Sequence, residues 1–238
     1  MICAERPHEA RCPLVSRPPR AELPSRARPR GRAFALTGRG AATAWSAVPW
    51  TNMAALDGDA TAYRTRLKAA YSDAGVYVLV ECEDRILSTR AYADHADVWK
   101  GDVVEVFLWP DESRPLYFQY AITPLGAELP LLVPNDGVSF VGWSPWHYEG
   151  ARRVRARTHV DGPREPLASV RGWSVELCVP YRLLSGLVRQ PPGPGSIWRG
   201  NVYRTDHDGG SPRVWAWCDR TGPSTHEFRS YGSLVFTR

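Results

Sequence analysis

The residues best suited to ligand chemistry lie in one short stretch, from Trp99 to Trp109. Its strand-forming residues alternate between two faces, so Glu105 shares a face with Val103 and Phe107. A carboxylate on a mostly apolar face is costly unless a partner or a ligand meets it. A flat tryptophan ring beside an acid suits a sugar, because the ring covers C–H groups while the acid accepts hydrogen bonds from hydroxyls. The competing interpretation is a structural salt bridge beside core tryptophans.

The charge of the chain is unevenly distributed. The 238 residues have a formal net charge of +5, but residues 1–40 hold nine arginines and three glutamates, a net charge of +6. The remaining 198 residues have a net charge of −1, which argues against a basic surface for nucleic acid. No apolar run approaches the roughly 18 residues of a membrane span. We therefore expect no nucleic-acid partner and no membrane span.

The cysteines and the first residues bear on the cellular compartment. None of the five cysteines forms a CxxC pair, which argues against a zinc site, and their odd number argues against a disulfide framework. Cys82 and Cys178 lie in apolar strand-like runs, as buried free thiols do. The first 30 residues lack the apolar core of a secretory signal, so the sequence taken literally predicts a cytoplasmic protein.

The chain divides into a leader and one domain. Residues 1–40 are rich in Pro, Arg, Ala and Gly and hold few large apolar residues, so we expect a disordered leader. Residues 41–238 show about ten strand-like runs separated by turn signals, which predicts an all-β, antiparallel, jelly-roll-like β-sandwich. A helical turn is expected at 181–187. The runs are 62–70, 76–82, 103–109, 116–123, 128–133, 152–160, 172–179, 198–205, 214–218 and 231–236.

Six short motifs follow one another between Trp45 and Phe236. They begin Tyr71-Ser-Asp73, Asp97-Val-Trp99-Lys-Gly-Asp102, Tyr117-Phe-Gln119, Trp173-Ser-Val-Glu176, Trp198-Arg-Gly-Asn201 and Tyr231-Gly232-Ser-Leu. In this order they resemble carbohydrate-binding module family 9 and its DOMON-like relatives. The resemblance implies one β-sandwich that grips a sugar, often a glycan chain end, between two tryptophans. It also implies a link to carbohydrate catabolism beside a separate glycoside hydrolase, and a secreted or periplasmic location.

The resemblance assigns roles to particular residues of this chain. Trp99 falls where the first sandwiching tryptophan lies, and Glu105 falls on the acid that contacts the ligand. Gln119 lies where the family can place a basic residue that bonds sugar hydroxyls. Asn201 and Tyr203 lie on a strand that lines the site.

The second sandwiching tryptophan is missing. The family places it just before the final Tyr231-Gly232 step, where this chain has His226 and Phe228. Either residue takes its place, or the double stack is lost; His226 is the one we include in the polar fringe. Structural calcium is also implied, with a plain Asp-Gly turn as the competing interpretation. Its candidate oxygen ligands are Asp57, Asp59 and Asp73.

Other functions compete with sugar binding. A glycoside hydrolase that cleaves O-glycosyl bonds needs two carboxyl groups about 5–10 Å apart. Asp102 and Glu105 point to opposite faces of a regular strand, and Glu176 is expected to pair with an arginine, so neither Asp102 nor Glu176 makes a good partner for Glu105 in hydrolysis. A DOMON-like haem site needs axial Met or His ligands, but Met53 is the only internal methionine and no histidine lies on a clearly apolar strand face. The remaining alternative is a domain that has kept the fold but lost the sugar site, and that binds a protein partner. We expect non-catalytic carbohydrate binding that requires no cofactor.

Overall fold

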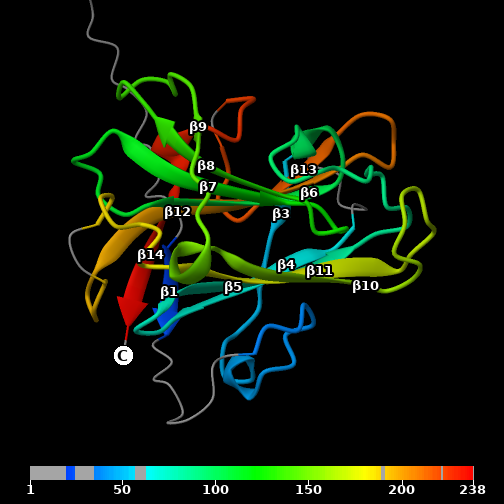
Figure 1. Ribbon diagram of the computed structural model, residues 1–238, viewed down its shortest axis with the longest axis horizontal. Helices are drawn as coiled ribbons and strands as arrows, with labels where there is room; N and C mark the ends of the chain where they lie inside the picture. Colours follow the sequence, from blue (N-terminus) through cyan, green and yellow to red (C-terminus); the bar gives the residue numbers. More distant parts are fainter. Residues whose placement is uncertain (1–19, 25–34, 57–62, 189–190, 221, 238) are drawn as a thin grey trace, which may run out of the picture.

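The computed structural model describes residues 20–24, 35–56, 63–188, 191–220 and 222–237. Within these residues the chain forms two β-sheets that lie in two layers, joined by turns and short 3-10 helices (Figure 1). The described helices are too short to span a lipid bilayer. The prediction of an all-β sandwich is confirmed.

The larger layer, sheet A, has the strand order β1-β14-β12-β6-β7-β8-β9, with β13 beside β12 and β3 beside β13. Among the described strands of this sheet, β1 and β14 run parallel and the other pairs are antiparallel. The strands are β1 (Arg20–Pro24), β3 (Ala54–Ala55), β6 (Val103–Trp109), β7 (Leu116–Ile122), β8 (Glu128–Pro134), β9 (Ser144–Pro145), β12 (Ile197–Asp206), β13 (Arg213–Ala216) and β14 (Gly232–Thr237).

The smaller layer, sheet B, has the order β10-β11-β5-β4-β2 and is antiparallel throughout its described strands. Four 3-10 helices lie in the described connections between strands. The strands are β2 (Thr51–Asn52), β4 (Thr65–Tyr71), β5 (Gly75–Glu83), β10 (Arg155–Val160) and β11 (Gly172–Pro180). The helices are η1 (Thr43–Trp45), η2 (Val98–Lys100), η3 (Gly150–Arg152) and η4 (Phe228–Ser230).

Each of the ten predicted strand-like runs overlaps one of the longer strands of the domain. The ends of the strands differ from the predicted ends by at most three residues, as where β4 and β10 each begin three residues after the predicted starts at 62 and 152. The short strands β2, β3 and β9 were not expected, because two residues are too few to show an alternating pattern. Residues 181–187 form successive turns, in which Leu183 N donates to Pro180 O and Leu187 N donates to Leu184 O.

Two parts of the predicted leader are described. Residues 20–24 form β1, which pairs with β14, and residues 35–40 lie against sheet B. The ordered chain therefore includes residues on the N-terminal side of the predicted domain boundary at 41. The other residues of the predicted leader, 1–19 and 25–34, lie outside the described residues.

The main core fills the space between the two sheets. Alternate side chains of the central strands meet there, including Val78 and Val80 of β5, Val106 of β6 and Leu177 of β11. Burial of such apolar side chains is the main favourable term in folding, about 25 cal/mol for each Å² removed from water. The packing of two sheets face to face accounts for the hydrophobic faces that the alternation predicts.

Cys82 and Cys178 are buried free thiols, as predicted, and Cys218 is a third. Burial raises the pKa of the Cys82 and Cys218 thiols to about 12. These cysteines are neutral at physiological pH and pack as small apolar residues.

Glu176 attaches the N-terminal segment to the outer face of sheet B. Its carboxylate accepts hydrogen bonds from the backbone N–H groups of Thr37 and Gly38, at 2.8 and 3.0 Å, and from Trp45 Nε1 at 2.7 Å. A fourth N–H, that of Gly40, lies 3.3 Å away. The expected pairing of Glu176 with an arginine is wrong: in the described structure, backbone amides and an indole satisfy this buried charge.

We predict that Glu176→Gln lowers the free energy of unfolding by about 3 kcal/mol, because hydrogen bonds to a buried charge contribute more than neutral ones. Urea unfolding followed by tryptophan fluorescence measures this change. Glu81→Gln is the matched control: the Arg66–Glu81 pair is partly exposed and should contribute less than about 1 kcal/mol. Equal effects of the two substitutions would contradict the role given to Glu176.

Candidate functional site

Strand β6 is buried on both faces, and its alternation decides which side chains reach each one. Val104 and Val106 lie in the core between the sheets, whereas Val103 and Phe107 belong to a second apolar layer on the outer face of sheet A. Glu105 shares the parity of this outer layer. The layer is covered by residues from β7, β12 and the segment before β14, including Tyr117, Tyr203, Phe228 and Tyr231.

The carboxyl group of Glu105 is desolvated and touches Gln119. Glu105 is 5% exposed, and Gln119 Nε2 donates to its Oε1 at 2.7 Å. Burial raises the pKa of Glu105 to about 7, although the hydrogen bond from Gln119 and the charge of Arg220 act in the opposite direction. Near neutral pH the carboxyl group therefore exists in both protonation states, and it can accept or donate a hydrogen bond.

Three buried polar atoms on this face lack a hydrogen-bond partner among the described residues: Gln119 Oε1, the Tyr203 hydroxyl and the Tyr92 hydroxyl. Tyr203 on β12 lies directly opposite Glu105 in the β12–β6 register. Tyr92 packs against the same outer layer. A buried polar group without a partner costs about 1–3 kcal/mol, so these atoms mark a place where ligand hydroxyl groups would be stabilising.

Trp99 is an exposed aromatic residue in the segment that leads into β6, the strand that carries Glu105. It lies on η2, immediately before β6, and is 39% exposed. Its neighbour Val98 is fully buried in the outer layer, and η2 packs against β7. The loop that carries η2 is fixed by Asp102, whose Oδ2 accepts the backbone N–H of Ser88 at 2.6 Å. A flat ring is thus held open to solvent near the strand that carries Glu105.

His226 is half-buried and lies toward the other end of β7. Its Nδ1 and the Tyr117 hydroxyl are hydrogen-bonded at 2.8 Å, and its ring stacks on Phe140 with the centroids 4.3 Å apart. Burial lowers the pKa of His226 to about 4, so the imidazole is neutral at physiological pH. Phe140 is 39% exposed. One face of His226 is covered, and Phe140 supplies the exposed aromatic surface at this position.

Phe228 occupies a different environment from His226. It is buried, and its ring meets Trp109 edge to face with the centroids 5.4 Å apart. Of the two residues considered in place of a second tryptophan, Phe228 therefore serves the outer layer, and His226 with Phe140 lies nearer to solvent.

Asn201 is buried, and its amide group bonds to the backbone. Its Nδ2 donates to Cys218 O at 2.9 Å, and its Oδ1 accepts the N–H groups of Cys218 and Val202 at 3.0 and 2.9 Å. These bonds hold the segment after β13 against β12. The structure thus gives Asn201 a supporting position, whereas Glu105, Gln119 and Tyr203 come together.

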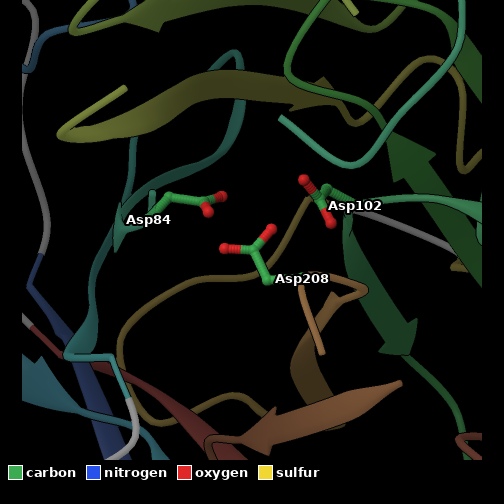
Figure 2. Close-up of side chains that lie close together, drawn as sticks. All are labelled: Asp84, Asp102 and Asp208. Carbon is green, nitrogen blue, oxygen red and sulfur yellow. The ribbon is translucent and has the colours of Figure 1, made fainter. Parts of the chain in front are cut away.

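Asp84, Asp102 and Asp208 form a cluster at the ends of β5, β6 and β12, and Figure 2 shows their carboxylates close together. One oxygen of each lies within 4.8 Å of the others, and carboxylate oxygens are the donors that calcium prefers. Arg204 supplies positive charge here, with Nη2 3.2 Å from Asp84 Oδ2 and 2.5 Å from Asp206 Oδ2. Burial raises the pKa of Asp84 and Asp102 despite this arginine.

This cluster consists of residues other than the predicted calcium ligands. Asp57 and Asp59 lie outside the described residues, and Asp73 is exposed in the turn between β4 and β5. Met53, considered as a haem ligand, is buried in the core between the sheets. Within the described chain, the acidic cluster is therefore the place with the chemistry of a cation site.

Residues 36–124 match the family model described as carbohydrate family 9 binding domain-like. The predicted resemblance to family 9 is confirmed on this part of the chain. The matched range contains Trp99, Glu105 and Gln119, whereas Tyr203 and His226 lie beyond it. No curated protein sequence matches the chain.

Solved structures share the fold over most of the chain. A candidate carbohydrate-binding protein from Bacteroides uniformis ATCC 8492 has a TM-score of 0.73 at 14% identity, covering 92% of this chain and 99% of its own. Two structures of a family 9 carbohydrate-binding module from Caldicellulosiruptor kristjanssonii have a TM-score of 0.62. The module in complex with cellotriose is 15% identical and the one with glucose 16%; they cover 92% of this chain and 94% and 97% of their own. At these identities the similarity is one of fold.

Two residues near the candidate site were not predicted from the sequence. Tyr92 lies in the loop between β5 and β6, and Phe140 lies in the loop between β8 and β9. Neither belongs to an alternating run, so periodicity does not assign a face to them. Phe140 stands among Val138, Val141 and Trp143, all exposed, and such an apolar loop was the available signal.

We predict that the burial of Glu105 makes stability depend on pH. Its pKa in the folded chain, about 7, lies above the ordinary glutamate pKa of 4.5, so its favourable contribution to stability is complete below pH 4.5 and is lost as the pH rises to 7. The loss amounts to about 3 kcal/mol. Unfolding measured at several pH values should show Glu105→Gln gaining stability relative to the parent chain over this interval. Because Asp102 is common to both chains, its titration cancels, and parallel curves would contradict the desolvation of Glu105.

Proposed function

We propose that the protein binds carbohydrate without catalysing a reaction on it, at the outer face of sheet A around Glu105. The observation that carries this proposal is a group of buried polar atoms without partners among the described residues, Gln119 Oε1 and the Tyr203 and Tyr92 hydroxyls, together with an exposed tryptophan on η2, just before β6. Sugar hydroxyls both donate and accept hydrogen bonds, so they can satisfy such a mixed set of groups. The family 9 match over residues 36–124 supports the same ligand class.

Each group has a distinct role in the proposed contact. The Trp99 ring stacks on the C–H face of a pyranose, as aromatic rings do with apolar ligand faces. Glu105 and Gln119 bond its hydroxyls, and the Tyr203 hydroxyl adds a further donor and acceptor. The neutral His226 completes the fringe through its ring nitrogen and its stack with Phe140. Asn201 acts indirectly, by holding the backbone beside Tyr203.

The degree of burial favours a chain end as the ligand. Glu105 and Gln119 are nearly inaccessible, so an internal stretch of a long glycan cannot lie along them. A terminal sugar presents fewer atoms and can enter at an edge. Such small contacts give micromolar to millimolar dissociation constants, roughly −4 to −8 kcal/mol. Glucose and cellotriose, the ligands named for the Caldicellulosiruptor kristjanssonii module, are the first probes.

Hydrolysis of O-glycosyl bonds is the less favoured alternative. Asp102 is committed to the backbone of Ser88 and His207, and Glu176 is committed to the N-terminal segment on sheet B. Neither is therefore available to act with Glu105 as an acid pair of the kind that glycoside hydrolysis requires. We propose instead that the protein serves carbohydrate catabolism as a binding accessory to a separate glycoside hydrolase.

We predict that Trp99→Ala and Glu105→Gln each weaken the binding of glucose or cellotriose by about tenfold or more, because stacking and buried hydrogen bonds are lost. Isothermal titration calorimetry on the full chain measures the affinities. Trp143→Ala is the matched control, since Trp143 is an exposed tryptophan in another loop. Unchanged affinity in Trp99→Ala would overturn the assigned site, and a parent chain that binds no glycan would overturn the function.

We also propose that calcium takes no part in the sugar contact, because among the described residues Glu105 belongs to no group of potential cation ligands. Affinity should be the same in calcium and in EGTA, as measured by the same calorimetry. A structural ion, which the family resemblance implies, would meet suitable oxygen donors at Asp84, Asp102 and Asp208. A calcium-dependent rise in Tm that Asp208→Asn abolishes would assign the ion to this cluster. An affinity lost in EGTA would contradict a calcium-independent contact.

A further inference from the structure

A cavity of about 560 Å³ lies at the opposite end of β6 from Trp99. It is bounded by the end of β6, the turn before β7, the turn after β8, the start of β12 and η4. Its volume falls within the usual range of small-molecule sites, about 300–1,000 Å³. The lining residues that matter below are Trp109, Glu112, Asn135, Asp136, Arg199 and Phe228.

Asn135 supplies a buried donor without a partner. The residue is 6% exposed, and its Oδ1 accepts the backbone N–H of Gly137 at 3.0 Å. Because that bond fixes the amide orientation, Nδ2 is the atom left free, and it has no hydrogen-bond partner in the described structure. An orphaned amide donor in the wall of a cavity is costly for folding alone and is satisfied by a ligand acceptor.

Arg199 adds a second donor of the same kind. Its Nη1 donates to Ser233 Oγ at 3.2 Å and its Nη2 to Arg229 O at 3.4 Å. Its Nε is buried and makes no hydrogen bond among the described residues, and the Glu112 carboxylate lies 4.0 Å from it. The guanidinium group is thus held in place from two sides, while its Nε–H makes no hydrogen bond among the described residues and faces Glu112 across a long ion pair.

The charges around the cavity balance. Glu112 and Asp136 are opposed by Arg199 and Arg229. Asp136 stays ionised, because the backbone N–H groups of Val138 and Ser139 lower the pKa of its carboxyl group. A ligand with a net charge of either sign would meet a group of the same sign here. The lining therefore favours a neutral ligand that can both donate and accept hydrogen bonds.

Two aromatic rings form the apolar part of the wall. Trp109 and Phe228 meet edge to face, 5.4 Å between centroids, and Trp109 Nε1 is fixed by a hydrogen bond to Arg114 O at 2.8 Å. Arg229 Nε donates to Gly137 O at 2.9 Å and ties η4 to the turn after β8. Hydrogen bonds therefore fix the segments that form the cavity. Its wall combines apolar rings with hydrogen-bond donors that lack partners.

We propose that this cavity is a second ligand site, which takes a small neutral polyhydroxylated molecule such as a single sugar unit. Hydroxyl oxygens accept from Asn135 Nδ2 and Arg199 Nε, hydroxyl hydrogens donate to Glu112 and Asp136, and the C–H groups face Trp109 and Phe228. The seven residues of β6 span about 20 Å between this cavity and Trp99, and the cavity adjoins the fringe of the proposed site at Phe140, which pairs with Asn135. The proposal of this second site does not depend on the proposed function.

The test uses the full-length Trp99→Ala chain, in which binding at the other site is expected to be weaker by about tenfold or more. Saturation-transfer NMR and calorimetry are run with methyl glucoside, methyl xyloside and inositol as neutral probes and with glucuronate as an anionic one. We expect at least one neutral probe to bind, and to bind more tightly than glucuronate. Absence of binding by every neutral probe, or tighter binding of glucuronate, would overturn the proposal.

Asn135→Asp in the same background identifies the site. It keeps the oxygen that accepts from Gly137 and replaces the orphaned donor with an acceptor, so affinity should fall about tenfold or more. Asn52→Asp, the same change at an exposed position on β2, should leave affinity unchanged. An unaltered affinity in Asn135→Asp, with an unfolding curve like that of the control, would overturn the site. If the parent and Trp99→Ala chains bind alike while Asn135→Asp does not bind, the proposed function fails and this inference stands.

Discussion

The burial of β6 on both of its faces is the constraint on which the arrangement of the site depends. An antiparallel sheet commonly packs one face and exposes the other, but sheet A carries a second apolar layer on its outer side. Whatever side chain stands at position 105 is therefore removed from water. A glutamate there has a raised pKa, a short bond to Gln119 and neighbours whose polar atoms lack partners. The same side chain on a bare sheet face would be an ordinary solvated carboxylate.

A second buried network positions the loop that bears Trp99. Asp102 immediately precedes β6. Its carboxylate accepts hydrogen bonds from the backbone N–H groups of Ser88, in the loop after β5, and of His207, just after β12. Arg204 lies within this network, with its guanidinium group over the Trp215 ring at 4.6 Å. Removing one partner from such a set is costly, because the remaining charges stay buried. The exposed ring is thus located by groups that never touch solvent.

The sequence predicts the strands well because alternation and turn residues are local signals. The runs around Val76, Val103 and Gly172 each match a strand to within one residue at either end, and the alternation that separates Val104 from Glu105 holds in the structure. Local signals of this kind cannot predict contacts between segments that are distant in the sequence. Glu176 bonds to residues more than a hundred positions away, so a paired arginine was the natural but wrong expectation. The stack of His226 on Phe140 and the commitment of Asn201 to Cys218 likewise depend on how loops meet.

The parallel pairing of β1 with β14 has a consequence for how the protein behaves at high concentration. Without β1, β14 would be the last strand on that side of sheet A and would present unpaired backbone groups. An open strand edge of this kind is a template for pairing with another copy, and natural proteins protect against it. Residues 20–24 move the open edge of the sheet from β14 to β1, a five-residue strand that ends at Pro24, and short edges with a proline pair less readily with another copy. A chain shortened to begin at residue 41 would lose this protection along with the amides that meet Glu176, and it would be prone to aggregate through its last strand.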